Sequence, residues 1–186
     1  MNSKDVHALV KKYIAGNVYL EQDQTYDMLA AYVMSTWSEI AVPANMQVLG
    51  DAASGNTTLI RTLERVTCWS IRAAEYSSAA LIDRVREQHY ATLYFDDPEQ
   101  MIAVAALNKS NPFVFTTRAV LHGSWMGKQK LRGCYLVRMV TGSRFMTDEI
   151  VPKAQDVVDA LTNWCGVEWL GDQRVSMDKI FMVVRA

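Results

Sequence analysis

The sequence predicts an α/β fold of three layers, with about five mostly parallel strands and helices on both faces of the sheet. Short apolar segments alternate with segments whose apolar residues recur at helical spacing, a pattern typical of a parallel sheet covered by helices. A glycine-containing turn joins one apolar segment directly to a helical one. The chain has 186 residues, half of them hydrophobic, and is therefore long enough to bury a sizeable core.

The elements can be placed from their apolar periodicity and from the glycine, serine and proline residues that bound them. Residues 1–140 are expected to form the core domain with its N-terminal helices, and residues 141–186 an α/β extension packed on the same domain. A loop is expected at 118–131. The predicted strands are 46–49, 68–72, 91–95, 112–117, 134–139 and 180–184, and the predicted helices are 3–16 (Ser3 as N-cap, Gly16 as stop), 26–37, 56–63, 77–85, 98–107 and 152–166.

Composition limits the function. The net charge of −1 and the pI of about 6.3 argue against a global polyanion-binding surface. Apolar runs are shorter than a membrane span, and the N-terminus does not resemble a signal peptide, so we expect no membrane contact and a cytoplasmic location. The cysteines (68, 134 and 165) and histidines (7, 89 and 122) are scattered without metal-ligand spacing, so we expect neither a disulfide framework nor a zinc site.

A phosphate-binding loop pattern joins the strand at 46–49 to the next helix. Gly50 and Gly55 have the spacing of G-x-x-x-x-G-K-[ST], and Thr57 occupies the Ser/Thr position. Asn56 stands where the pattern has lysine. Backbone amides of such loops surround phosphates, while the lysine contacts the terminal phosphates. The predicted nucleotide-binding residues are Gly50, Asp51, Ala52, Ala53, Ser54, Gly55, Asn56, Thr57 and Thr58.

A second pattern, made of acidic residues, follows the strand at 91–95. In nucleotide hydrolases with phosphate-binding loops, an apolar strand ends in an acidic residue that holds magnesium, often followed by an acid that activates water. Asp96 and Asp97 have this arrangement, so Thr57 and Asp96 are the candidate Mg²⁺ ligands. The alternative is that both aspartates cap the helix opened by Pro98. Taken together, the two patterns predict a P-loop NTPase-like fold.

The segments 50–59, 77–82 and 91–97 carry a resemblance to a known group. Residues from about 10 to 140 resemble the ATPase domains of phage and mobile-element primase–helicase-type proteins, especially the domain-of-unknown-function ATPases of actinobacterial phages. The resemblance implies a phage or mobile-element origin, hence the host cytoplasm, and Mg-ATP or Mg-ADP as ligand. It also implies an arginine finger, for which Arg132 is the candidate, at a one-residue slip from the pattern.

Three departures from this group argue against catalysis. Asn56 replaces the lysine, Asp97 stands in place of glutamate, and Arg132 fits only with the slip. Loss of a hydrogen bond to a charged group weakens binding by roughly ten- to a hundredfold, and the Asp51 carboxylate adds repulsion. Candidates for a replacement cation are Arg61, Lys109, Lys128 and Lys130, with the alternative that these are ordinary solvated surface charges.

These observations lead to two main expectations of function, beside a third in which the fold is only a scaffold that acts independently of nucleotide. The first is a catalytically impaired P-loop pseudo-ATPase that acts as a binding or interaction module with a protein partner, and is not an active enzyme. The alternative is a deviant but active ATPase that assembles as a homo-oligomer on nucleic acid. Nucleic acid would contact the loop that contains Lys128, Lys130 and Arg132, because cations interleaved with an aromatic residue suit a single strand. A solvated charge cluster at the sheet edge is the alternative for this loop.

Overall fold

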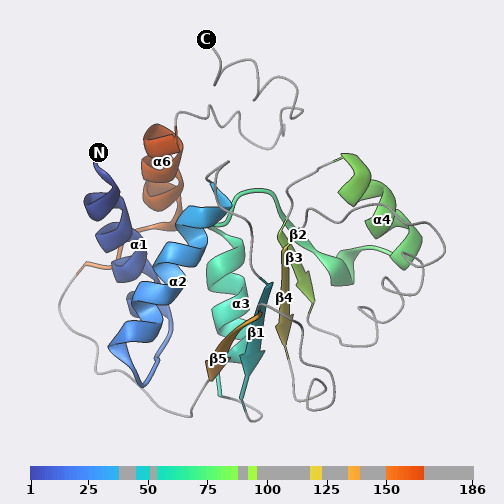
Figure 1. Ribbon diagram of the computed structural model, residues 1–186, viewed down its shortest axis with the longest axis horizontal. Coiled ribbons are helices and arrows are strands. Elements are labelled where there is room, and N and C mark those ends of the chain that lie inside the picture. The colour runs from blue at the N-terminus through green and yellow to red at the C-terminus, as the bar shows by residue number, and fades with distance from the viewer. Residues whose placement is uncertain are drawn as a thin grey trace.

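The computed structural model describes residues 1–37, 45–50, 54–87, 92–95, 118–122, 134–138 and 150–165. These residues form helices, short strands and one 3-10 turn, η1 (Ala73–Glu75) (Figure 1). The helices are α1 (Ser3–Asn17), α2 (Asp23–Thr36), α3 (Asn56–Glu64), α4 (Ser78–Glu87) and α6 (Ala154–Cys165), and the strands are β1 (Asn45–Leu49), β2 (Ser70–Arg72), β3 (Thr92–Phe95), β4 (Arg118–His122) and β5 (Cys134–Arg138).

The described strands pair in the order β2-β3-β4-β1-β5, and every pair is parallel. Strand β1 therefore lies between β4 and β5, with Val48 in register with both His122 and Val137. Met46 and Val48 lie on the same face of β1 because side chains alternate along a strand, and both are fully buried, so this face of the sheet is covered. Because the strands are parallel, their carboxyl ends share one edge of the sheet, and β1 delivers the glycine loop to that edge.

The prediction of a three-layer P-loop NTPase-like fold, with helices on both faces of the sheet, is wrong, because most of the described helices pack on one another. Helices of 9 to 15 residues outweigh strands of 3 to 5 residues. Among the described helices, α3 makes the main contacts with the strands, and these are few and fall mostly on β2 and β4. Helix α1 packs on α2, α3 and α6 instead. The apolar stripes of α1, α2 and α6 are thus buried against other helices, and these helices form one group beside α3, away from α4 (Figure 1).

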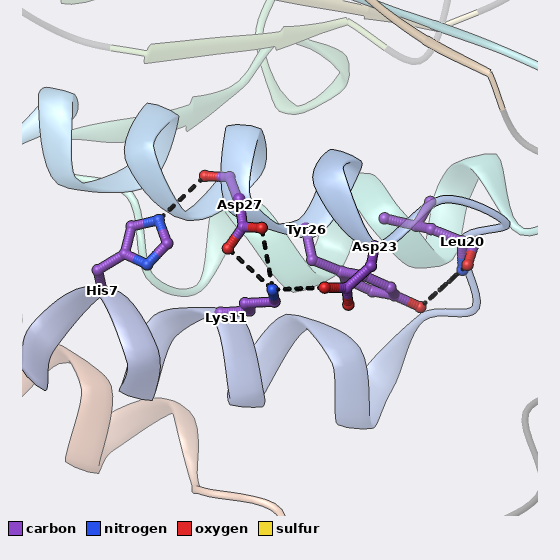
Figure 2. A network of polar contacts seen from close by, with 6 residues as sticks. All are labelled: His7, Lys11, Leu20, Asp23, Tyr26 and Asp27. Atoms are coloured by element: carbon purple, nitrogen blue, oxygen red, sulfur yellow. Dashed lines mark hydrogen bonds and ion pairs between the residues drawn. The ribbon is translucent and has the colours of Figure 1, made fainter. Parts of the chain in front are cut away.

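The hairpin of α1 and α2 is joined by a network of charges. Figure 2 shows the Lys11 ammonium of α1 between Asp23 and Asp27 of α2. Lys11 Nζ lies 2.8 Å from Asp23 Oδ2 and 2.9 Å from Asp27 Oδ1. His7 Nε2 lies 3.2 Å from the Asp27 carbonyl oxygen. These contacts fix the relative rotation of two helices whose opposite faces are buried in the core.

A tyrosine closes the turn of this hairpin. The buried Tyr26 hydroxyl accepts a 2.7 Å hydrogen bond from the Leu20 amide (Figure 2). It donates one of 3.0 Å to the Val18 carbonyl. One side chain thereby satisfies two buried backbone groups that lie outside any helix or strand. Because such groups are expensive to leave unpaired, this contact stabilises the turn between α1 and α2.

The turn from α3 to β2 is anchored to the end of α2. Trp37 Nε1 donates a 2.8 Å hydrogen bond to the Val66 carbonyl, and the Thr36 hydroxyl accepts one of 3.0 Å from the Cys68 amide. Trp69 adopts a left-handed φ of 53°, a conformation that is uncommon for residues other than glycine. The carbonyl of Trp69 accepts from the Thr92 amide at 2.9 Å. The buried position of this turn compensates for its backbone strain.

Several element boundaries differ from those predicted. Asn2, and not Ser3, caps α1, and the helix continues through Gly16 to Asn17. Residues 118–122, expected in a loop, form strand β4, because their apolar centre fits between β1 and β3. The predicted elements at 98–107, 112–117 and 180–184 lie outside the described residues.

Candidate functional site

The candidate site is the turn from the carboxyl end of β1 into α3. Gly55 is the residue before the helix and has φ 93° and ψ 12°, in the left-handed region that favours glycine. A glycine at this position lets the chain turn directly from the loop into the helix. The glycine that the spacing pattern requires thus has a conformational reason to be there.

Asn56 occupies the lysine position of the pattern, and its side chain makes a hydrogen bond within the loop. Its side-chain Nδ2 donates a 3.0 Å hydrogen bond to the Gly50 carbonyl oxygen, across six residues. The side chain is almost completely buried, with the residue only 7% exposed. The loop is therefore closed by a neutral amide, and this position supplies no positive charge to a ligand.

Two buried polar atoms in this turn have no partner among the described residues. They are Asn56 Oδ1 and Ser54 Oγ, and each belongs to a residue that is 7% exposed. Buried polar atoms are hydrogen-bonded in the great majority of proteins, and an exception requires an explanation such as a bound water or ligand. Both atoms belong to the turn next to the start of α3. The Ser54 hydroxyl can donate a hydrogen bond to an anion, whereas Asn56 Oδ1 only accepts and would need a water molecule or a cation as partner.

Among the described residues, no side chain caps the N-terminus of α3. Its first backbone hydrogen bond runs from the Leu59 amide to the Gly55 carbonyl at 2.9 Å, so the amides of residues 56–58 have no partner within the helix. By contrast, the Asn2 side chain caps α1 by accepting from the Lys4 and Asp5 amides, each at 3.0 Å. Unpaired amides and the helix dipole together attract anions to the start of α3.

The two faces of α3 differ in exposure. Thr57 and Thr58 are exposed at the first turn, and Arg61 is exposed one turn later. The opposite face carries Leu59, Ile60 and Leu63, which are buried in the core. The hydroxyl of Thr57, predicted as a Mg²⁺ ligand, is therefore open to solvent, as a ligand of an incoming metal–phosphate complex must be.

The other predicted site residues are not placed by the structure. The strand before the acidic pair ends at Phe95. Asp51, Ala52, Ala53, Asp96, Asp97, Lys128, Lys130 and Arg132 lie outside the described residues. Within the described ranges, no group of three or more His, Cys, Asp and Glu side chains could hold a metal ion. A metal at this site would therefore need Asp96 or the ligand's own phosphates in addition to Thr57.

Two positions at the carboxyl edge of the sheet were not singled out from the sequence. His122 is the last residue of β4 and Arg138 the last of β5, the strands on either side of β1. Arg138 is in register with Leu49, the residue just before the glycine loop. Their place at the end of an apolar run is a usable signal, because parallel strands bring such terminal residues to one edge.

A second feature is an open groove of about 450 Å³ between α1, α2 and α6. Ala31, Met34 and Trp164 give it an apolar lining, and Lys4 and His7 add basic groups. Trp164 is fixed there by a 3.0 Å hydrogen bond from its Nε1 to Ser3 Oγ. The groove combines an apolar surface with basic side chains, a mixture that suits an acidic peptide segment better than a phosphate.

No helix in the described part of the chain is both long and apolar enough to cross a membrane.

The chain was compared with protein families and with curated proteins. No protein-family model matches the chain, and no curated protein matches it significantly. The interpretation of the site accordingly depends on the geometry of the turn from β1 into α3.

Proposed function

We propose that the protein is a catalytically impaired, nucleotide-binding interaction module. Mg-ADP or Mg-ATP binds weakly at residues 50–58 through backbone amides at the start of α3. The bound nucleotide is not hydrolysed at a significant rate, and its occupancy affects binding to a protein partner. The support comes from the start of α3, which no described side chain caps, together with the unpartnered hydroxyl of Ser54.

The observation that carries the proposal is the hydrogen bond from Asn56 Nδ2 to the Gly50 carbonyl. It keeps the loop closed without a cation, so the anion-binding shape can persist while the charge needed for phosphoryl transfer is missing. Catalysis of phosphoryl transfer is almost entirely positioning and electrostatic stabilisation. Removal of one cation therefore weakens turnover far more than it weakens binding.

The interaction role follows from this separation of binding from turnover. A domain that holds a nucleotide without consuming it can report the nucleotide only by changing its affinity for something else. The groove between α1, α2 and α6 is the described surface with suitable chemistry for a protein segment. The partner proposed there is an acidic peptide, which the Lys4 ammonium would attract.

Calorimetric titration of Mg-ADP and Mg-ATP into the full chain tests the proposal, with Asn56→Lys and Asn56→Ser measured in parallel. We expect weak binding by the native protein, tighter binding by Asn56→Lys by about tenfold or more, and no tightening by Asn56→Ser. The serine variant controls for the loss of the hydrogen bond to Gly50. No binding by the native chain would contradict the proposal.

A phosphate-release assay separates this proposal from the active-ATPase alternative. We expect release at the background rate, both with and without single-stranded DNA. Steady turnover that collapses in Asp96→Ala and increases with DNA would instead establish an ATPase working on nucleic acid. Size-exclusion chromatography with light scattering, run with and without Mg-ATP, would then determine whether this activity depends on a homo-oligomer.

A further inference from the structure

We propose that Arg61 supplies the positive charge that the glycine loop lacks, by binding the phosphates held at the start of α3. The inference rests on the proposed function and deepens it. It assigns recognition of the ligand's negative charge to Arg61, a side chain of α3. The site then combines backbone amides of 56–58, the Thr57 hydroxyl and one guanidinium.

Helix geometry places Arg61 on the face that the ligand would use. Arg61 follows Thr57 by four residues and Thr58 by three, so all three share one side of α3, and all three are exposed. Four residues correspond to about 6 Å along the axis. Long side chains in helices lean toward the N-terminus, so the guanidinium of Arg61 is directed back over the first turn.

The charge on Arg61 is not used by the described residues. Arg61 makes no hydrogen bond or ion pair with them, whereas the nearby Glu64 is paired with Arg72. A guanidinium presents several N–H groups in one plane, which matches the oxygens of a phosphate. Glu64 is the only acidic residue of α3, and it is paired with Arg72. No carboxylate of α3 therefore neutralises Arg61 when a phosphate approaches this face.

A competing role for Arg61 is purely structural. It lies in the last turn of α3, where a cation interacts favourably with the helix dipole. That role predicts a loss of stability on substitution and no effect on ligand binding. The two roles are therefore separated by measuring affinity and unfolding on the same variants.

The test is calorimetric titration of Mg-ADP into the native chain, Arg61→Gln, Arg61→Lys and Arg65→Gln. Arg65 is the matched control, because it is an exposed arginine four residues further from the site, about 6 Å along the axis. We expect Arg61→Gln to weaken binding about tenfold at low salt, and Arg61→Lys to recover part of the loss. Arg65→Gln should leave affinity unchanged within about twofold, since exposed charges are screened with distance.

The salt dependence gives a second readout. Affinity of the native chain should fall between 50 mM and 500 mM NaCl more steeply than that of Arg61→Gln, because screening acts on the charge that the variant lacks. Equal affinities and equal salt slopes for native and Arg61→Gln would overturn the inference and leave the proposed function intact. Failure of the native chain to bind Mg-ADP at all would overturn both, and is recognised before any variant is compared.

Discussion

The carbonyl oxygen of Gly50 and the side-chain amide of Asn56 are joined by a 3.0 Å hydrogen bond that spans the glycine loop. The bond ties the end of β1 to the first residue of α3. It uses the one donor group that Asn56 has to offer in the position where related loops present a cation. The loop thus retains its closure through a neutral contact, and the consequences can be measured on the folded protein.

Asn56→Asp should destabilise the protein. The carboxylate keeps the size of the amide but loses the N–H donor, and it faces the Gly50 carbonyl in a buried turn. We expect the free energy of unfolding to fall by about 1–3 kcal/mol at pH 7, measured by urea denaturation. Asn2→Asp is the matched control, because Asn2 caps α1 through its oxygen and an aspartate preserves that contact. An equal loss in both variants would contradict the role assigned to the Asn56 donor.

Trp37→Phe should cost about 1–3 kcal/mol of stability, because it leaves the buried Val66 carbonyl without its donor. The loss is measured by chemical denaturation with an unchanged m-value. Trp164→Phe is the control, since its indole donates to Ser3 at an exposed site where water can replace it. There we expect less than about 1 kcal/mol. A larger loss of stability in Trp164→Phe than in Trp37→Phe would contradict the conclusion that the buried Trp37–Val66 hydrogen bond is the more stabilising of the two.

The hydroxyls of Thr67 and Tyr94 lie 2.8 Å apart in the core. Each single change, Thr67→Val or Tyr94→Phe, removes this hydrogen bond but keeps the other buried hydroxyl. We expect each to lower the free energy of unfolding by about 1–2 kcal/mol. The double variant should be less destabilised than the sum of the two, because it removes both polar groups together. A double-mutant cycle from thermal unfolding measures this coupling. Simple additivity would show that the two groups act independently.

Lys11 should give the α1–α2 hairpin a pH-dependent stability. The hydrogen bonds that Lys11 donates to Asp23 and to Asp27, helped by the charges of these carboxylates, raise the pKa of Lys11 above its ordinary 10.5. The raised pKa means that the folded state holds the proton more tightly. The stabilisation is therefore fully present below pH 10.5 and is lost as the pH rises through the folded-state value.

This expectation is tested by the melting temperatures of the native chain and Lys11→Met from pH 8 upwards. The difference between them should stay constant to about pH 10 and then shrink. Added salt should also reduce it, because the pair is partly exposed to solvent. A difference that is the same at every pH and salt concentration would indicate a packing role for the lysine stem instead of a charge interaction.

The sequence is informative about elements and less so about their packing. The spacing of Gly50 and Gly55 correctly placed a turn between β1 and α3, and apolar periodicity located α1 and α6 to within a few residues. Periodicity shows that a helix has a buried face but not which element covers that face. For this reason the sequence did not indicate that α1 packs on α2, α3 and α6.

The site was predictable in position and not in detail. The pattern identified Asn56 as the departure from a phosphate-binding loop. Its hydrogen bond to Gly50 depends on a side-chain conformation that no spacing rule gives. The apolar positions Leu59, Ile60 and Leu63 already indicated which side of α3 faces the core, and the structure confirms that Thr57 and Arg61 are exposed on the other side.

The packing of α6 on α1 has a consequence for how the chain is made. Ser3 and Trp164 are hydrogen-bonded although 161 residues separate them. A ribosome releases the N-terminal part of a chain first, so α1 emerges long before its partner α6 has been synthesised. The α1–α2 hairpin, with its local Lys11 and Tyr26 contacts, can form early, but the apolar side of α1 that receives α6 stays uncovered until α6 has been synthesised. During that interval this side of α1 is a surface on which the nascent chain can aggregate and to which chaperones can bind.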